Sequence, residues 1–299
     1  MVTLPDLIKT YGCMMTESTN NMVWRDGVAV ITGAASGIGE ALARHAACKL
    51  GMKVVLADIA EQPLQGLAAE LSEQGCEVLA LRTDVADAAS MIQLAEKTRS
   101  HFGDVTLLIN NAGIETLGFS WEIPTAQWEK ILRVNIHGVV NGVNAFAGAM
   151  LDSGKRCVIA NMSSIAGVSI APIQASYVMS KHAVLSFTEC LHLEMAMKSD
   201  KVQVSAVLPG PVKTKIFASV AQQHDPVVAE HHQAMIDLLE ANGMTAQAAA
   251  ETIFEQLAKG QFWVSTHPEM TAMMAKQRAA NLASLATPFM LMDSAFNID

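Results

Sequence analysis

The chain has 299 residues, of which 51% are apolar and 16% are charged, and its net charge at pH 7 is −9. This composition excludes a disordered or fibrous protein, and a negative charge without a basic patch argues against nucleic acid as a partner. No apolar run approaches the roughly 20 residues that span a bilayer, so no membrane association is expected. The length fits one large α/β domain or two small ones.

The N-terminus has no basic segment followed by an apolar core, so a secretory signal is not expected. Among nine histidines, His231 and His232 are adjacent and His224 lies nearby, but their spacing matches no familiar set of metal ligands. Solvated loop histidines are the preferred interpretation, and no metal site is predicted. The cysteines are scattered and odd in number, which is typical of reduced thiols in a cytoplasmic protein: Cys13, Cys48, Cys76, Cys157 and Cys190.

After an extension of mixed polarity over residues 1–24, short apolar runs alternate with helix-forming runs. Strands of this kind, separated by helices, predict parallel βαβ crossovers and a doubly wound α/β sheet in one domain over residues 25–265. The expected strands are residues 27–32, 53–58, 78–82, 105–109, 156–162, 202–208 and 261–265. The expected helices are residues 38–50, 62–74, 88–101, 125–151, 177–198 and 246–259.

Two segments interrupt this alternation. Residues 211–242 are irregular and contain Pro226, which is typical of a substrate loop or lid, partly helical over residues 228–240. The C-terminal tail, residues 266–299, is rich in Met and Ala. It would serve as a lid on the substrate pocket, as a subunit contact or as a helix packed in the core, and packed core is the preferred interpretation.

A glycine-rich turn joins the first predicted strand to the first predicted helix, in the stretch Thr32-Gly33-Ala34-Ala35-Ser36-Gly37-Ile38-Gly39. Glycines at this place permit a tight turn and let the backbone approach a pyrophosphate at the helix N-terminus, where free N–H groups favour anions. The spacing is G-x-x-x-G-x-G rather than the commoner G-x-G-x-x-G, but the flanking strand and helix are in the required order. The turn therefore predicts a dinucleotide site.

Asp58 ends the second predicted strand. A carboxylate there accepts hydrogen bonds from both hydroxyls of the adenosine ribose and repels a 2′-phosphate, which favours NAD over NADP. The alternative is a strand-end aspartate that caps the next helix. Asp84, after the third strand, is assigned either to the adenine amine or to helix capping.

Tyr177 and Lys181 are four residues apart at the start of a long helical run, so both side chains lie on one face of the helix. An ammonium beside a phenol favours the phenolate, so the tyrosine would exchange a proton near neutral pH rather than at its reference pKa of about 10. Alone, this spacing is equally typical of a helical tyrosine beside an incidental lysine.

Taken together, these residues resemble the short-chain dehydrogenase/reductase family. The motifs occur in the family's order over about residues 25–265: the glycine turn, Asn110-Asn111-Ala112-Gly113, Asn135, Ser164, Tyr177 with Lys181, and Pro209-Gly210 with Thr214. The resemblance implies a Rossmann-like sheet of about seven parallel strands and hydride transfer with a nicotinamide. It also implies a homodimer or homotetramer, formed through the helices that carry Asn135 and Tyr177.

Transferred to this chain, the family's catalytic set is Asn135, Ser164, Tyr177 and Lys181. Tyr177 would exchange the alcohol proton, Lys181 would lower its pKa and bind the nicotinamide ribose, and Ser164, rather than its neighbour Ser163, would hold the substrate oxygen. Asn135 would hold a water that links Lys181 to solvent, although a buried helical asparagine bonded to backbone is the plainer interpretation. The predicted cofactor contacts are Gly33, Ser36, Gly37, Ile38, Gly39, Asp58, Asp84, Val85, Asn111, Ala112, Gly113, Tyr177, Lys181, Pro209, Gly210, Val212 and Thr214.

The substrate site is expected beside these motifs and is mostly apolar, which favours a fairly hydrophobic secondary alcohol or ketone. The predicted contacts are Ser164, Tyr177, Glu115, Ile165, Gln174 and Phe217, with Pro172 and Ile216 as further wall residues. Two alternatives remain open: an NADPH-dependent ketoreductase, against which Asp58 argues, and a non-catalytic regulatory protein that binds a dinucleotide.

Overall fold

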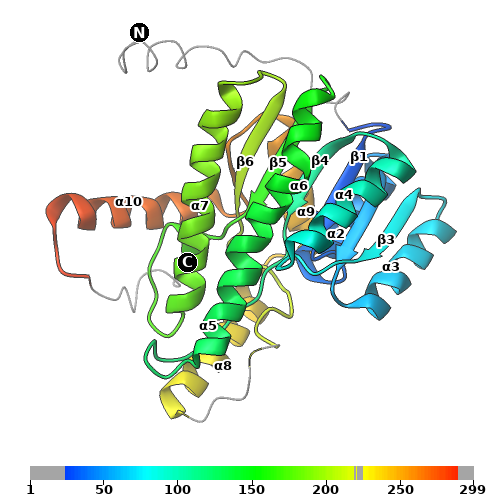
Figure 1. The fold of residues 1–299 in the computed structure, drawn as a ribbon. Helices are drawn as coiled ribbons and strands as arrows, with labels where there is room; N and C mark the ends of the chain where they lie inside the picture. Colours follow the sequence, from blue (N-terminus) through cyan, green and yellow to red (C-terminus); the bar gives the residue numbers. More distant parts are fainter. Residues whose placement is uncertain (1–23, 219, 221–224, 289–299) are drawn as a thin grey trace, which may run out of the picture.

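The computed structural model describes residues 24–218, 220 and 225–288, so the predictions for residues 1–23 and 289–299 lie outside the described residues. In this described part, seven parallel strands form one sheet in the order β3-β2-β1-β4-β5-β6-β7 (Figure 1). The order reverses beside β1, which pairs with β2 on one side and β4 on the other, so the predicted doubly wound sheet is confirmed. The strands are β1 (Val28–Thr32), β2 (Lys53–Asp58), β3 (Val78–Arg82), β4 (Val105–Asn110), β5 (Cys157–Met162), β6 (Val202–Leu208) and β7 (Trp263–Ser265).

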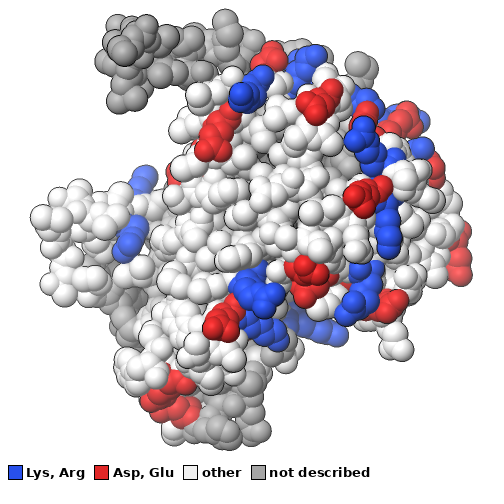
Figure 2. Space-filling view, viewed as in Figure 1, with Lys and Arg blue, Asp and Glu red and all other residues white. Residues whose placement is uncertain are grey.

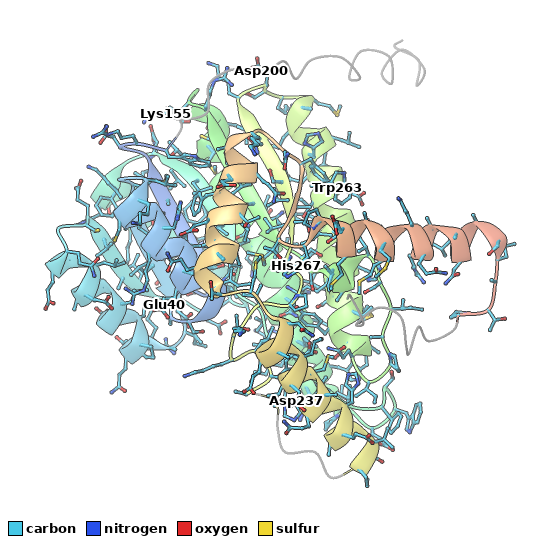
Figure 3. All side chains as sticks on the ribbon, turned by 180° about the vertical axis from the view of Figure 1, so that it is seen from behind. Glu40, Lys155, Asp200, Asp237, Trp263 and His267 are labelled. Carbon is cyan, nitrogen blue, oxygen red and sulfur yellow. The ribbon has the colours of Figure 1, made fainter. Side chains whose placement is uncertain are left out.

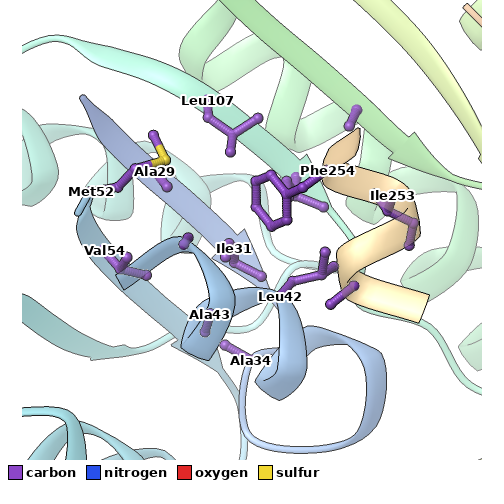
Figure 4. Packing of buried hydrophobic residues seen from close by; sticks show 14 of the residues in the cluster. Ala29, Ile31, Ala34, Leu42, Ala43, Met52, Val54, Leu107, Ile253 and Phe254 are labelled. Atoms are coloured by element: carbon purple, nitrogen blue, oxygen red, sulfur yellow. The ribbon is translucent and has the colours of Figure 1, made fainter. Parts of the chain in front are cut away.

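Helices cover both faces of this sheet. Every residue of β1, β4 and β5 is buried, as expected for strands that have helices on either side. One face carries α2 (Gly37–Arg44), α3 (Glu61–Glu73) and α9 (Ala246–Ala258), and it is turned toward the viewer in Figure 3. The other face carries α4 (Ala88–Phe102), α6 (Gly138–Asp152) and α7 (Ala175–Ala196). Figure 4 shows the packing on the face of α2 and α9, where Phe254 lies beside Ile31 and Leu42; each fully buried side chain of this size stabilises the fold by about 2 kcal/mol.

Two of the predicted helices contain a π-helical turn that the periodicity did not indicate. The run near residues 38–50 divides into α2 and the turn η1 (His45–Lys49). The run near residues 125–151 divides into α5 (Thr125–Leu132), the turn η2 (Arg133–His137) and α6. A π-turn holds more residues than an α-turn and changes the direction of the side chains it carries. Asn135 is the buried residue of η2, so this turn sets the direction of a predicted catalytic side chain.

The segments outside the regular alternation are more helical than predicted. Residues 211–242 include α8 (Pro226–Asn242), whose first turn is capped by the carboxylate of Asp225. His231 and His232 lie half-buried on this helix, so their interpretation as solvated loop residues is wrong. Within the described ranges no group of three or more His, Cys, Asp or Glu side chains is placed to hold a metal ion.

The C-terminal tail contains α10 (Pro268–Ser284), which projects away from the sheet in Figure 1. None of its residues is buried, so the interpretation as a helix packed in the core is wrong. Its methionines and alanines are spread around the helix rather than gathered in one stripe, which explains why no face of it enters the core. None of the helices within the described residues has both the length and the apolar character to cross a membrane.

A chain of buried hydrogen bonds joins the middle of the sheet to α7. Asn110 Nδ2 donates to Asn161 Oδ1 at 2.9 Å, and Asn161 Nδ2 donates to Thr188 Oγ1 at 3.1 Å. Gly142 of α6 packs directly on the Asn110 amide, where any side chain would overlap its oxygen. This contact fixes how closely α6 approaches β4, beside the segment that carries Asn111.

Two glycines of the same helix test this packing. We expect Gly142→Ala to lower the free energy of unfolding by about 2 kcal/mol or more, because the new methyl group overlaps Asn110. Gly148→Ala is the matched control: it is exposed on α6 with open space around it, and it should raise stability by about 0.5–1 kcal/mol through helix propensity. Urea unfolding measures both changes, and equal effects of the two substitutions would contradict the role of Gly142.

Candidate active site

A cavity of about 1800 Å³ lies at the carboxyl ends of the strands, where open α/β sheets place their ligands. Its walls come from the loops after β1 to β6 and from α8 and α10. Every residue predicted for the cofactor or the substrate lines it, and of the four predicted catalytic residues only Asn135 does not. Asn135 lies just behind the wall: the position that a Cβ would take on Gly113 is 3.5 Å from its Oδ1 and 3.4 Å from Lys181 Nζ.

The glycine turn has the geometry of an anion cradle. Gly33 and Gly37 have φ of +67° and +58°, a region that other residues rarely adopt. A Cβ on Gly39 would overlap the Gly33 carbonyl, so only glycine allows the helix to begin this close to the strand. Ser36 is the N-cap residue of α2, and its side chain makes no capping bond. The first N–H groups of α2 therefore border the cavity and suit a pyrophosphate.

Asp58 is held beside this turn. Its Oδ2 accepts a hydrogen bond from Ala35 N at 3.0 Å, and its Oδ1 accepts one from Ala60 N at 2.9 Å. The N-cap residue of α3 is Ala60, so the carboxylate does not cap that helix as the alternative interpretation held. Asp58 instead borders the cavity next to Ile59, whose side chain is 56% exposed. Ile59 was not predicted, because an apolar residue after a strand has no distinctive sequence signal.

The segment Asn111–Gly113 is tied to the end of β1. Thr32 Oγ1 accepts hydrogen bonds from Asn111 N at 2.9 Å and Ala112 N at 3.1 Å, while Asn111 Nδ2 donates to Thr32 O at 2.9 Å. Because β1 and β4 are neighbours in the sheet, these bonds join the glycine turn to the loop after β4. The two walls of the predicted cofactor site are thus one rigid unit.

The Pro209–Thr214 segment closes the cavity from the other side. A Cβ on Gly37 would lie 3.3 Å from the Thr214 methyl group, so this segment faces the glycine turn at close range. Gly210 N donates to Thr266 Oγ1 at 2.9 Å, and the ring of His267 packs on Gly210 so closely that a side chain there would overlap it. His267 was not predicted as part of the site, since it lies beyond the family motifs in the sequence.

Tyr177 and Lys181 occupy the first turns of α7 and face the same cavity. Lys181 is buried, its Nζ donates to Met162 O at 3.0 Å, and it lies 5.4 Å from the centre of the Tyr177 ring. Ser164 borders the cavity, accepts from Ala166 N at 3.1 Å and hydrogen-bonds to the phenol of Tyr177. Its rival Ser163 donates to the Lys181 carbonyl at 2.8 Å, a structural bond that supports the choice of Ser164.

Asn135 connects α7 to the loop after β4. Its Oδ1 accepts from Ile114 N at 2.9 Å, and its Nδ2 donates to Ile114 O at 3.0 Å and to Ser180 Oγ at 3.0 Å. Ser180 Oγ in turn donates to the Tyr177 carbonyl at 2.7 Å. Asn135 is thus a buried helical asparagine bonded to backbone, as the plainer interpretation of the sequence has it. Through Ser180 it also positions the turn that carries Tyr177.

Burial shifts the pKa values at this centre away from the predicted direction. The pKa of Tyr177 is raised rather than lowered, because burial and the nearby Glu115 both oppose the phenolate, and the hydrogen bond with Ser164 offsets them only in part. Burial also lowers the pKa of Lys181 to about 8, against the pull of Glu115. The raised pKa of Tyr177 is the opposite of the direction that its spacing from Lys181 predicts, because burial and Glu115 outweigh the other influences on the phenol.

Glu115 is a third titratable group in the same cavity. It is 5% exposed, and burial raises its pKa to about 8, so its carboxyl group is mostly protonated at neutral pH. One oxygen accepts from Thr116 N at 3.0 Å and the other from Gln174 Nε2 at 3.3 Å. These bonds hold the carboxyl group toward the start of α7 and leave a neutral acid that can donate a hydrogen bond.

The outer part of the cavity is apolar and is covered by α8. Phe217 packs with Leu117, Ile173 and Val228 in a small cluster separate from the two main cores. His232 of α8 contacts the Phe217 carbonyl at 2.9 Å, which holds the helix over this end. The wall also includes five residues of α10 that were not among the predicted site residues: Met273, Met274, Gln277, Arg278 and Asn281.

Comparisons with known proteins agree with this geometry. The family model for short-chain dehydrogenases matches residues 27–225. A CLA biosynthesis dehydrogenase/reductase of Lactiplantibacillus plantarum is 32% identical over 257 residues, which cover 82% of this chain and 90% of that protein. A 1-deoxy-11-beta-hydroxypentalenate dehydrogenase of Streptomyces avermitilis is 30% identical over 83% of this chain and 87% of its own length.

The solved structures include a short-chain dehydrogenase/reductase from Burkholderia phymatum in complex with NAD. It is 33% identical to this chain, its TM-score is 0.87, and the match covers 91% of this chain and 99% of that one. The family match spans more than half of the sequence and agrees with the strand order and the placement of the motifs. The chain therefore belongs to the short-chain dehydrogenase/reductase family of nucleotide-binding, Rossmann-fold oxidoreductases.

Proposed function

We propose that this protein is an NAD-dependent dehydrogenase that interconverts a fairly hydrophobic secondary alcohol and its ketone. The observation that carries the proposal is the shared cavity: the glycine turn, Asp58, Ser164, Tyr177 and Lys181 all line it. A site for the hydride acceptor, a place for the substrate oxygen and a group that exchanges the hydroxyl proton thereby lie together at the carboxyl ends of the strands. A regulatory protein without catalysis would need neither the place for the substrate oxygen nor the proton-exchanging group.

The nicotinamide cofactor, when bound, supplies the hydride acceptor or donor. Its pyrophosphate suits the N-terminus of α2, which Gly39 allows to begin close to the end of β1. Asp58 beside the turn suits the adenosine ribose hydroxyls, and its charge opposes a 2′-phosphate. The Pro209–Thr214 segment lies opposite the turn and suits the nicotinamide end.

In the proposed reaction, Tyr177 takes the proton of the alcohol in oxidation and returns it in reduction. Ser164, already hydrogen-bonded to the phenol, holds the substrate oxygen next to it. Lys181 provides positive charge beside the ring and donors for the nicotinamide ribose. Asn135 acts through Ser180 and the backbone of α7 to position Tyr177.

The substrate class is proposed from the walls of the cavity. Ile165, Phe217 and the cluster under α8 are apolar and suit a hydrocarbon portion of the substrate. Glu115, linked to Gln174, provides one neutral polar group, which suits a substrate with a second oxygen at some distance from the reacting carbon. We further propose that residues 25–265 form the catalytic domain and that residues 211–242 form a lid over the apolar end of its cavity. In this proposal α10 borders the entrance of the cavity.

Homo-oligomers are proposed from the surface of α7. Met179 and Leu193 of α7 are 45% and 61% exposed, and Met197, the C-cap residue directly after it, is 67% exposed. Figure 2 shows few charged side chains over the middle of the face on which α6 and α7 lie in Figure 1.

A cytoplasmic location is proposed from the free cysteines and would be checked by cell fractionation.

The function is tested by NADH formation or consumption across a panel of secondary alcohols and ketones, with NAD and NADP compared. On the best substrate, Tyr177→Phe should lower kcat by about a thousandfold, because the general acid/base is lost, with the Kd for NAD changed by less than about threefold. Turnover within about tenfold of the unmodified enzyme would contradict the role of Tyr177. Cofactor binding without turnover on the whole panel would support the non-catalytic alternative.

The cofactor preference is tested at Asp58. We expect Asp58→Ala to narrow the ratio of kcat/KM for NAD over NADP by about tenfold or more, because it removes both a ribose acceptor and a negative charge. Asp87→Ala is the control: Asp87 caps α4 outside the cavity, so its loss should leave the ratio unchanged. A preference for NADP in the unmodified enzyme would favour the ketoreductase alternative instead.

The proposed interface is tested by sedimentation of the full chain. We expect a dimer or tetramer at micromolar concentration, and Leu193→Asp should weaken the association by about tenfold or more because it places a charge in an apolar contact. Ile92→Asp is the matched control, since Ile92 is 53% exposed on α4. A monomeric unmodified protein, or equal effects of the two substitutions, would contradict the interface on α7.

A further inference from the structure

Two cysteines that are far apart in the sequence meet at the surface. Cys48 lies on η1 and Cys76 lies just before β3, and their sulfurs are 3.3 Å apart. Cys48 is exposed and Cys76 is partly exposed, so small molecules in solution can reach the pair. The family motifs, the cavity and the proposed reaction use neither residue.

The surrounding contacts hold the two segments in this alignment. Arg44, one turn before Cys48, makes a two-pronged contact with Glu70 of α3 at 2.6 and 2.7 Å. Cys48 Sγ also donates to Gln74 Oε1 at 3.5 Å, two residues before Cys76. The backbone of Cys76 is fixed by a hydrogen bond from its N–H to Leu71 O at 3.0 Å. The contacts of Arg44 with Glu70 and of Cys48 with Gln74 therefore hold α2 and η1 beside the C-terminal end of α3, which brings the two thiols together.

We propose that Cys48 and Cys76 are a site of reversible thiol oxidation, at which a peroxide converts the pair into an intramolecular disulfide. A disulfide bond is about 2.05 Å long, so the sulfurs need to approach by only about 1.2 Å. Because the segments that carry Cys48 and Cys76 already lie side by side, the bond can form without a change in the rest of the fold.

The chemistry balances as a two-electron oxidation. Hydrogen peroxide oxidises the Cys48 thiol to a sulfenic acid and is reduced to water; the Cys76 thiol then attacks that sulfur, the S–S bond forms, and a second water leaves. Cys48 is the first to react because it is the more exposed, and because burial and its neighbour raise the pKa of Cys76 to about 11. A dithiol reductant reverses the reaction by exchange.

The cross-link would close a loop from Cys48 to Cys76, which contains β2, with Asp58 at its end, and α3. Both cysteines lie at the amino ends of β2 and β3, whereas Asp58 and the cavity lie at the carboxyl ends. The bond therefore constrains the unfolded chain rather than the active site. Its readouts, thiol content and thermal stability, do not depend on the proposed activity.

The experiment uses the full chain, reduced, freed of reductant and treated with hydrogen peroxide. We expect the free thiols to fall from the five of the sequence to three, peptide mapping to identify a Cys48–Cys76 link, and a dithiol to restore all five. Closing this loop should raise the apparent Tm by about 5 °C. Cys48→Ser and Cys76→Ser should each show no linked peptide and no rise in Tm.

Cys190→Ser is the matched control, because it removes an exposed thiol of α7 and should leave the cross-link and the rise in Tm intact. The proposal is overturned if oxidation yields a disulfide-bonded dimer, a link through Cys13 or Cys190, or sulfinic acid at Cys48 without a cross-link. An unchanged Tm in a fully cross-linked sample would overturn the part that assigns the bond a stabilising effect.

Discussion

The burial of the sheet on both faces is the constraint on which the rest of this structure depends. Strands whose every residue is buried have no place for polar chemistry along their length, so the reactive side chains follow the strands where they end. Two buried strand residues, Asn110 and Asn161, are joined to each other and to the hydroxyl of Thr188 by hydrogen bonds. These bonds satisfy most of the buried polar atoms and fix α7 against the sheet, although Asn110 Oδ1 has no hydrogen-bond partner.

The same burial creates an electrostatic conflict at the start of α7. An ammonium, a phenol and a carboxyl group share one cavity, and the protein environment favours the neutral form of each of them. Lys181 keeps a backbone carbonyl as partner, and Glu115 keeps an amide and a backbone N–H. Glu115 and Lys181, both with a pKa of about 8, are the two groups here whose neutral and charged forms are closest in free energy near neutral pH, so a charged ligand would shift their protonation first.

The sequence was sufficient for the sheet, because apolar runs of strand length alternated with helical runs and left few other arrangements. It was sufficient for the motif residues around the cavity, because the motifs follow strand ends, but not for Ile59 or for the α10 residues that complete the wall. It did not indicate the π-turn at Asn135, nor the bonds of this side chain to Ile114, since neither leaves a mark in the apolar periodicity. The depth of Glu115 and the meeting of Cys48 with Cys76 depend on tertiary packing, and α10 showed a composition typical of a core helix without the stripe that would place it there.

The exposure of α10 has a consequence for the dynamics of the chain. A helix without a buried residue is held mainly by its own backbone bonds and by its attachment near Ser265, whose hydroxyl contacts that of Thr271 at 2.7 Å. Isolated helices of this length are marginal in water, so amide protons toward Ser284 would exchange by fraying, without unfolding of the sheet. A ligand or subunit that covers α10 would then slow the exchange of its amide protons, and the rates of individual residues would show where it binds, while the rates in the core would not change.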